Sequence, residues 1–240
     1  MLKIDSRFKY VYETHLHTKE GSKCASSTGA EMARACFEAG YTGIMVTDHF
    51  YYGNTAADKS LPWEDWVHEY CKGYFNAKEE GDKIGLQVFF GWESTYDGTD
   101  FLIYGRDPDW LLKHPEIRDA SIKEQFEMIH PEGLIIHAHP FREDYYIPQI
   151  SLYPEYIDGV ETANATHVSK YSKNHFNPDF DVKALEYAEK YDFPKVAGSD
   201  IHSTRLFYGG VAFDHRIGSI DDYIAAVKNR EEYLLLNGAD

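Results

Sequence analysis

Histidines and carboxylates recur in this sequence in short segments whose residue types and spacing are typical of metal ligands. Five segments carry them: His15 with His17, Asp48 with His49, Glu93 alone, His137 with His139, and Asp200 with His202. Each segment ends a stretch of apolar or β-branched residues, which predicts that each lies at the end of a β-strand. Five such strand ends meeting at one place would put imidazoles and carboxylates within one coordination sphere.

The spacing of the histidine pairs favours metal binding over a structural role. Residues two apart on a strand point to the same face, so His15 and His17 could bind one ion through two imidazoles. We expect the same geometry for His137 and His139. A lone buried histidine is more often a structural residue, but several pairs beside carboxylate-bearing strand ends indicate a metal site. Imidazoles and carboxylates without thiolates suit Zn²⁺, Mn²⁺ or Fe²⁺.

The carboxylates also indicate which reaction such a site would catalyse. A carboxylate such as Glu93 or Asp200 can bridge two ions, which a neutral imidazole cannot do. Clusters of two or three ions hydrolyse phosphate esters by lowering the pKa of a bound water and stabilising the attacking and leaving oxygens. The candidate ligands therefore predict a cluster of two or three divalent ions and phosphoester hydrolysis.

Two arginines, Arg142 and Arg205, closely follow candidate ligands in the sequence. We expect both at the rim of the site, where a guanidinium can bind phosphate oxygens bidentately. Surface salt bridges in a very acidic protein are the alternative interpretation of each arginine taken singly.

The predicted elements alternate between strands and helices. The expected strands lie at 9–16, 42–48, 86–93, 100–105, 133–140, 158–162 and 194–200, and a strand, a helix and a short strand follow. This alternation predicts an α/β fold with a parallel sheet, either doubly wound or closed into a barrel. In both architectures active sites form at the C-terminal ends of the strands, where the candidate ligands lie.

Helix signals are clear in several places. Thr28 and Glu31 form a capping box, and Gly40 fits the C-terminal cap of the same helix. Pro62 suits a first helical turn, and the aromatic residues over 63–75 recur at helical spacing. We interpret that aromatic stripe as core packing. Further helices are expected over 121–130 and 179–191.

Composition limits the class of protein. The 240 residues suit one domain over 1–240, and no linker or repeat divides them. The net charge of −16 argues against long nucleic acids, although metal ions can attract a small phosphorylated substrate.

No apolar run could span a membrane, and three cysteines without a CxxC pair suit the cytoplasm. No GxSxG, P-loop or GxGxxG motif appears. Nothing in the sequence indicates an oligomeric state.

Taken in order, these segments resemble the polymerase-and-histidinol-phosphatase (PHP) family. The matching segments are ETHLHT (13–18), VTDH (46–49), GWE (91–93), HAHPFR (137–142), VETANA (160–165) and GSDIH (198–202). Each motif alone is weak, but the ordered set is specific. The resemblance implies a single-domain, distorted seven-stranded (β/α)7 TIM-like barrel with two or three metal ions.

The resemblance also implies a role for each candidate. One ion would be bound by His15, His17, Glu93 and Asp200. A second would be bound by Glu93 and His139, and a third by His49 and His202. Asp48 would orient its neighbours, and His137 would more readily support the ligands than join them.

The sequence departs from the family pattern at two places. A histidine or aspartate expected soon after the first motif is missing, and Glu20 or Cys24 would have to replace it, although we expect Cys24 to be a small buried residue. A histidine expected near the fourth strand is also missing; the candidates there are Asp100, Asp107 and His114. His167 is a further candidate ligand or a loop histidine.

The expected function is hydrolysis of a phosphomonoester of a small metabolite, as in histidinol phosphatases, by a metal-bound hydroxide. One alternative is a phosphodiesterase or exonuclease acting on nucleotides or short oligonucleotides. Another is a non-catalytic metal-binding domain, which the full set of candidate ligands disfavours.

Overall fold

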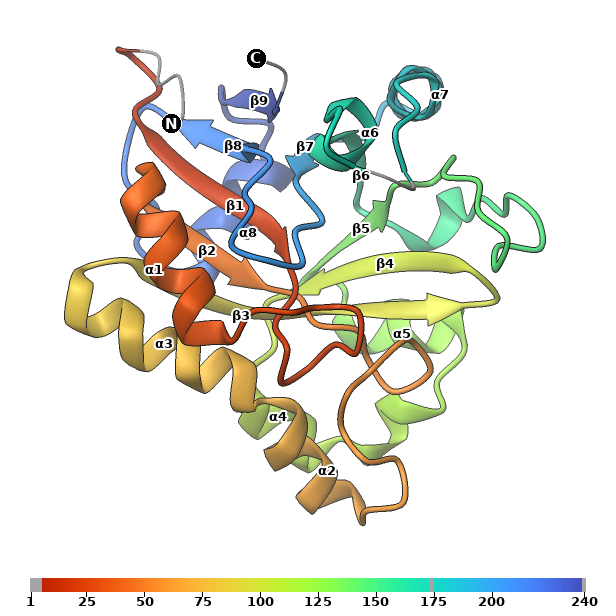
Figure 1. Cartoon of the computed structure of the whole chain (residues 1–240). Coiled ribbons are helices and arrows are strands. Elements are labelled where there is room, and N and C mark those ends of the chain that lie inside the picture. Colours follow the sequence, from red (N-terminus) through yellow and green to blue (C-terminus); the bar gives the residue numbers. More distant parts are fainter. Residues whose placement is uncertain (1–5, 173–174, 239–240) are drawn as a thin grey trace.

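The structure, a computed structural model, describes residues 6–172 and 175–238 and contains one nine-stranded mixed sheet (Figure 1). Its order is β7-β6-β5-β4-β3-β2-β1-β8-β9. The strands are β1 (Tyr10–Leu16), β2 (Gly43–Val46), β3 (Gln87–Tyr96), β4 (Thr99–Tyr104), β5 (Leu134–Ala138), β6 (Gly159–Asn164), β7 (Lys195–Gly198), β8 (Gly209–Phe213) and β9 (Leu234–Asn237). The expected domain of 1–240 also includes residues 1–5, 173–174 and 239–240, which lie outside the described residues.

The sheet curls into a nearly closed barrel, as expected. After β7 the chain meets the end of β1: the His17 amide donates to the Ile201 carbonyl at 2.9 Å, and the Ile201 amide to the His15 carbonyl at 3.2 Å. Strands β1 to β7 therefore form the barrel. The strand count differs from the expected seven because β8 pairs with the start of β1 and β9 pairs with β8.

Strand β4 corrects the expectation of a parallel sheet, because it pairs antiparallel with both neighbours. A two-residue turn, Asp97 and Gly98, connects it to β3, and both residues have positive φ (49° and 83°). Asp-Gly is the sequence typical of such hairpin turns, since Gly tolerates this backbone freely and Asp better than most residues. The reversal places the start of β4 beside the C-terminal ends of β3 and β5.

Helices cover the outside of the barrel. They are α1 (Gly29–Ala39), α2 (Trp63–Tyr70), α3 (Lys72–Ile84), α4 (Pro108–Lys113), α5 (Ile122–Ile129), α6 (Ala165–Val168), α7 (Asp179–Lys190) and α8 (Ile220–Lys228), with 3-10 turns at Pro115–Arg118 and Pro154–Tyr156. The Thr28–Glu31 capping box and the left-handed Gly40 cap of α1 are both present, as the sequence predicts.

The aromatic stripe expected over 63–75 is largely core packing. Trp66 and Tyr70 of α2 are buried and stack at 4.8 Å, and Phe50 packs edge-on against both. These rings belong to one buried cluster with Phe90 and Trp92 of β3. No helix among the described residues is both long enough and apolar enough to cross a membrane.

Candidate metal centre

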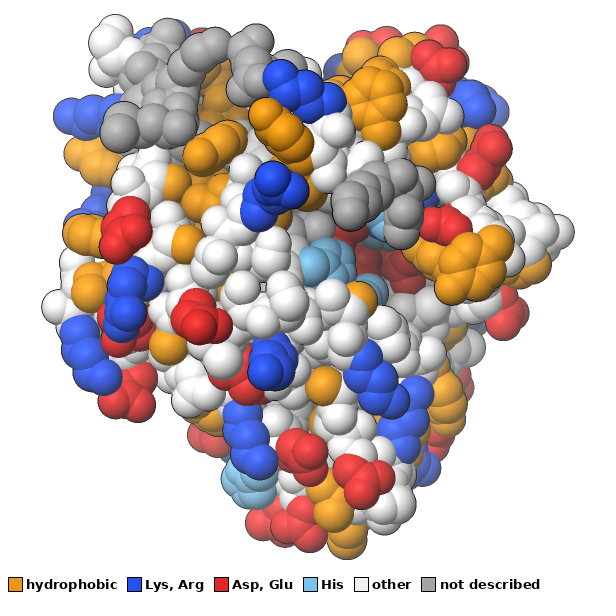
Figure 2. All heavy atoms as spheres, in the orientation of Figure 1, with side chains coloured by type: hydrophobic (Ala, Val, Ile, Leu, Met, Phe, Trp, Pro, Cys, Tyr) orange, Lys and Arg blue, Asp and Glu red, His pale blue; other side chains and the backbone are white. Residues whose placement is uncertain are grey.

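The seven candidate ligands converge at one end of the barrel, where Figure 2 shows histidine and acidic side chains gathered in a hollow. Four overlapping groups have ligand atoms within 4.8 Å of one another: His15, His17 and Glu93; Glu93, Asp100 and His139; His17, His49 and His202; and His15, His139 and Glu161. Asp200 joins them, with Oδ1 3.2 Å from Nε2 of His17 and 3.5 Å from Nε2 of His15.

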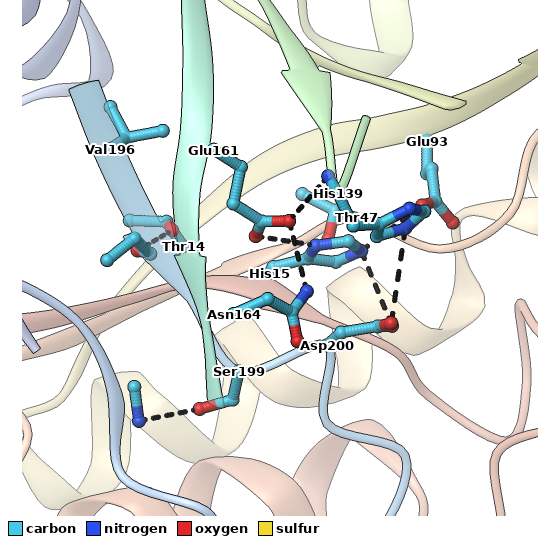
Figure 3. A network of polar contacts seen from close by, with 12 residues as sticks. Thr14, His15, Thr47, Glu93, His139, Glu161, Asn164, Val196, Ser199 and Asp200 are labelled. Carbon is cyan, nitrogen blue, oxygen red and sulfur yellow. Dashed lines mark hydrogen bonds and ion pairs between the residues drawn. The ribbon is translucent and has the colours of Figure 1, made fainter. Parts of the chain in front are cut away.

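The ring of His15 is oriented by the carboxylate of Glu161 on strand β6. Its Nδ1 lies 3.0 Å from Oε1 of Glu161, which can only accept a hydrogen bond when ionised (Figure 3). Nδ1 therefore carries a proton, and Nε2 points toward Glu93 Oε1 at 3.3 Å. Burial alone would lower the pKa of His15, but the carboxylates of Asp200, Glu161 and Glu93 raise it well above its usual value, so without metal Nε2 also keeps a proton. Carboxylate–histidine pairs of this kind fix the tautomer of metal ligands.

His17 is oriented in the same sense by a hydroxyl group. Ser22 Oγ donates to Asp48 at 2.7 Å, so it accepts from Nδ1 of His17 at 3.1 Å. The Nε2 lone pair of His17 then faces Asp200 at 3.2 Å and Glu93 at 3.6 Å. Both Nε2 atoms are buried and make no hydrogen bond.

This arrangement fits a cation. An imidazole nitrogen facing carboxylate oxygens at 3.2 to 3.6 Å needs a positive charge between them, which a metal ion supplies or, on His15, a proton. Glu93 Oε2 is buried without a hydrogen bond, and Nδ1 of His49 lies 2.6 Å from it. Imidazole nitrogens and carboxylate oxygens converging on a shared space are the donor set of zinc, manganese and iron sites.

The charge balance supports the same interpretation. Six buried carboxylates lie in or beside this end of the barrel: Glu13, Asp48, Glu93, Asp100, Glu161 and Asp200. Arg142 is the one buried Lys or Arg side chain of the described residues. Buried charges need compensation, and two or three divalent ions would supply it.

Two candidate ligands have an unusual backbone conformation. His139 has φ 28° and Asp200 has φ 54°, in the left-handed region that non-glycine residues rarely adopt. Such strain concentrates at functional sites, where the surrounding structure maintains it. Here it turns each side chain into the cluster just after its strand has ended.

Arg142 lies inside the site, which corrects the expected place at the rim. Its guanidinium is 4% exposed and donates to Asp200 at 2.5 Å, to Nε2 of His167 at 3.1 Å and to Thr166 at 3.2 Å. Nε2 of His167 can accept because its Nδ1 donates to Asp181 at 2.6 Å. Burial alone would raise the pKa of Asp200, but the Arg142 guanidinium and His15 hold it well below its usual range.

Arg205 and Asp48 occupy different surroundings. Arg205 is exposed, with its guanidinium 5.0 Å from the ring of Tyr171, so its phosphate-binding role stays a prediction. Asp48 is buried and accepts from the Thr18 amide and hydroxyl, both at 2.6 Å, and from Ser22. It thereby holds the segment that carries the hydroxyl partner of His17. Burial raises the pKa of Asp48 to about 6.

His137 does not pair with His139 as a chelate, contrary to expectation. Its ring stacks on Phe101 at 5.0 Å and meets the edge of Tyr187, and neither nitrogen makes a hydrogen bond. Burial lowers its pKa to about 3, so it is neutral. The expected same-face geometry is wrong because β5 ends at Ala138 and the backbone turns at His139.

The departures from the family pattern can now be placed. Cys24 is exposed, so the expectation that it is buried is wrong, and its thiol interacts with His49 and His202. Glu20 accepts from the Gly29 amide at 3.0 Å. Asp107 caps α4, accepting from the Trp110 amide at 2.7 Å, and His114 stacks on Trp110 at 4.3 Å. Of the fourth-strand candidates, Asp100 alone belongs to a ligand group.

Two residues of this network are not predicted from the sequence. Glu161 accepts from His15, from the His139 amide and from Asn164, each at 3.0 Å (Figure 3). Glu13 accepts from the amides of His15 and Ser199. Two signals were available: Glu13 stands two residues before His15, and Glu161 lies on a strand within a matching segment.

The comparisons support the fold. No model of a known protein family and no curated protein matches the sequence. Several solved structures do match at low identity. A two-domain protein from Bacteroides vulgatus, containing a predicted PHP-like metal-dependent phosphoesterase, is 14% identical with a TM-score of 0.60; the match covers 95% of this chain and 66% of that one.

Two further structures match over nearly their whole length. One, described as a metal-dependent phosphoesterase from Bifidobacterium adolescentis, is 15% identical with a TM-score of 0.54, covering 91% of this chain and 96% of that one. An amidohydrolase from Chromobacterium violaceum, with bound sulfate and no metal, is 14% identical with a TM-score of 0.54, covering 95% and 98%. The chain therefore has the fold of PHP-like metal-dependent phosphoesterases.

Proposed function

We propose that this protein is a metal-dependent phosphoesterase that hydrolyses a phosphomonoester of a small metabolite. The observation that carries the proposal is the pair of buried imidazole Nε2 atoms, on His15 and His17, that face Glu93 and Asp200 without a hydrogen bond. His15, His17, Glu93 and Asp200 would bind one divalent ion, Zn²⁺, Mn²⁺ or Fe²⁺. Glu93 and His139 would bind a second ion.

His49 and His202 would bind a third ion at the outer side of the cluster. His202 donates from Nδ1 to the Asp200 carbonyl at 2.9 Å, which leaves Nε2 free for a ligand bond. When bound, divalent ions at such sites neutralise phosphate charge and make a water molecule nucleophilic near neutral pH.

The protein's own residues would prepare the site before the substrate arrives. Arg142 keeps Asp200 ionised and in place, and Glu161 holds the ring of His15. Because these groups are already in place, the site needs no rearrangement during the reaction. Arg205, exposed near the site, would bind phosphate oxygens.

The space beside the cluster suits a small substrate. A cavity of about 280 Å³ adjoins Asp200 and His202 and is also lined by Tyr171 and Phe207. This volume is close to the lower end of small-molecule sites. The net charge of −16 further disfavours long polyanions.

A nucleotide phosphodiesterase is the second candidate. Tyr171 and Phe207 in the cavity wall could stack on a base, as aromatic side chains do in many nucleotide sites. Activity toward a diester with little activity toward a monoester would favour this candidate.

The test measures bound metal and turnover together. Wild type is compared with Asp200→Ala and with Asp221→Ala, an exposed carboxylate of α8 that serves as the control. Metal per chain is measured by elemental analysis, and turnover with p-nitrophenyl phosphate and bis(p-nitrophenyl) phosphate. We expect two or three ions in wild type and in the control, and monoesterase activity reduced to background in Asp200→Ala. A folded wild type that binds no Mn²⁺ or Zn²⁺ and turns over neither ester would refute the proposal.

A further inference from the structure

The guanidinium of Arg142 is held by a histidine as well as by Asp200. Nε2 of His167 accepts from Nε of Arg142 at 3.1 Å. A guanidinium has donors only, so this nitrogen carries no proton, and the proton of the ring lies on Nδ1. Burial and the charge of Arg142 lower the pKa of His167, which keeps the ring neutral. Nδ1 donates to Oδ1 of Asp181 at 2.6 Å, so neither nitrogen is left for a metal ion.

Asp181, in the first turn of α7, stabilises this tautomer. Its side chain is 16% exposed and that of His167 is 1% exposed. A ring N–H without an acceptor is costly in such a place, so the proton favours the nitrogen that faces the carboxylate. Without Asp181 the proton would be free to move to Nε2. There it would face the N–H of Arg142 and push the guanidinium away from Asp200.

Asp181 also reaches the carboxylate that orients His15. Both of its oxygens lie 3.3 Å from the amide nitrogen of Asn164. The Asn164 side chain donates to Oε2 of Glu161 at 3.0 Å, and Oε1 of Glu161 accepts from His15 (Figure 3). One carboxylate therefore lies behind two of the proposed ligands of the first ion, His15 and Asp200.

A role confined to helix α7 explains the geometry of Asp181 less well. An acidic residue in the first turn stabilises a helix through its dipole, and the exposed Asp179 of the same turn suits that role. The carboxylate of Asp181 instead faces His167 of α6 and Asn164 at the end of β6.

We infer that Asp181 is a positioning residue: it fixes the tautomer of His167, which in turn holds the guanidinium of Arg142 against Asp200. This inference rests on the proposed function, because Asp200 is one of the proposed metal ligands. The effect of Asp181 on metal binding passes through His167 and Arg142. A variant of Asp181 should therefore resemble a milder variant of Arg142.

The test compares two variants of Asp181 with a matched control. Asp181→Leu keeps the approximate shape without an acceptor, and Asp181→Asn keeps one acceptor oxygen. Asp179→Leu is the control, because it removes a negative charge from the same helical turn. Long-range ¹H–¹⁵N spectra of metal-free protein read the tautomer of His167, and calorimetric titration reads the affinity for Mn²⁺. Burial raises the pKa of Asp181 to about 7, so both are measured at pH 8, where Asp181 is ionised.

We expect the Nδ1–H tautomer of His167 in wild type and control, and the Nε2–H tautomer to appear in Asp181→Leu. The dissociation constant for the tightest Mn²⁺ ion should rise about 10-fold, the low end for outer partners of ligands. Asp181→Asn should show both changes to a smaller extent, and it decides the test if the leucine variant does not fold.

A double variant separates positioning from a general loss of structure. Asp181→Leu combined with Arg142→Gln should weaken Mn²⁺ binding by less than the product of the two single losses, because the residues act in series. A folded Asp181 variant with the wild-type tautomer of His167, or single losses that multiply in full, would overturn the inference.

The inference and the proposed function fail differently. A wild type that binds Mn²⁺ and hydrolyses an ester, with an unchanged His167 tautomer in the Asp181 variants, overturns the inference alone. A wild type that binds metal without hydrolysing either ester refutes the proposed reaction, while a changed tautomer and weaker binding in the variants still support Asp181 as a positioning residue. A wild type that binds no metal overturns both.

Discussion

The proton positions on His15 and His17 are set by neighbours that do not face the cluster. Glu161 accepts from Nδ1 of His15, and Ser22, whose own proton goes to Asp48, accepts from Nδ1 of His17. Each ring therefore turns Nε2, and not Nδ1, toward the same space. A metal ion needs this tautomer, because the ligand nitrogen must be unprotonated.

Glu161→Gln tests this arrangement. The amide group of glutamine cannot accept from all three present donors, His15, the His139 amide and Asn164, because one of its ends is itself a donor. We expect metal affinity to fall about 10- to 100-fold with little loss of secondary structure. Titration of metal-free protein by calorimetry measures it. Glu186→Gln, an exposed carboxylate of α7, should bind metal like wild type. Unchanged affinity in Glu161→Gln would mean that His15 needs no carboxylate partner.

Arg142→Gln tests the buried guanidinium. The substitution removes the guanidinium that pairs with buried Asp200 and removes the donors to His167 and Thr166. We expect the free energy of unfolding of the metal-free protein to fall by about 3 kcal/mol, the usual cost of breaking a buried ion pair. Urea denaturation measures it.

Arg142→Lys should recover little of this loss, since one ammonium group cannot reach three separated acceptors. Arg205→Gln removes an exposed guanidinium and is the control, with stability within about 0.5 kcal/mol of wild type. A lysine variant as stable as wild type would show that charge alone, and not the fork of donors, holds Asp200.

At the scale of elements, the sequence predicts what depends on local pattern and strand direction. The capping box of α1 follows from short-range spacing, and the α/β sheet follows from strand–helix alternation. The closed barrel, as opposed to a doubly wound sheet, is what the resemblance to the PHP family implies. Ligands at the C-terminal ends of parallel strands follow from the fold class. Asp100 and His137 do not: Asp100 reaches the site because β4 reverses, and His137 misses it because the backbone turns at His139.

Contacts between residues far apart in the sequence also could not be predicted. Arg142 and Asp200 are 58 positions apart, and His15 and Glu161 are 146 apart. No local spacing links them, so the sequence indicates a guanidinium near the site but not that Asp200 occupies it. The positions of such residues depend on how β1, β6 and β7 meet at the closure of the barrel.

Gly198→Ala tests that closure. Gly198 ends β7, and an added Cβ would lie 2.6 Å from the His15 Cβ and 2.7 Å from Oε1 of Glu161. Neither residue can move without disturbing the hydrogen bond between Nδ1 of His15 and Oε1 of Glu161. We therefore expect about 1–3 kcal/mol of destabilisation and weaker metal binding. Thermal unfolding and metal titration measure the two effects. Gly218→Ala, whose Cβ would meet only the carboxylate end of Asp222, should change neither by much.

At the scale of the whole molecule, the fold concentrates negative charge at one end of a barrel that is already acidic overall. Six buried carboxylates surround or adjoin the cluster, with Arg142 as the one buried Lys or Arg among residues 6–172 and 175–238. Without metal, folding must bring these groups together at a cost in free energy. With metal, the same groups become the source of binding energy, which adds to stability because the unfolded chain has no such site.

Opposite pH dependences of the two forms follow from this difference. Burial raises the pKa of Glu13 to about 7, and nearby carboxylates outweigh burial to raise the pKa of His15. The pKa of His49, which lies beside Glu93, is also raised. Each of these groups keeps its proton to higher pH in the folded state than in the unfolded chain. Each therefore makes the folded protein less stable as pH rises. His17, whose burial lowers its pKa, acts in the opposite sense, but only below about pH 6.5. Cys24, whose pKa His202 and His49 lower to about 6 against the effect of burial, also acts in the opposite sense above that pH, but it is one group against His15 and His49.

Metal-free protein should therefore become less stable from pH 6.5 to 8, whereas the metal-loaded protein should become more stable, because deprotonated ligands bind the ions more tightly. We expect the difference in Tm between the two forms to widen by about 5 °C or more over this range, since 1 kcal/mol shifts Tm by about 2–4 °C in a chain of this size. Thermal scans with chelator and with Mn²⁺ measure it. Parallel Tm curves would mean that these buried groups do not exchange protons for metal, and the charge deficit would then need another cation.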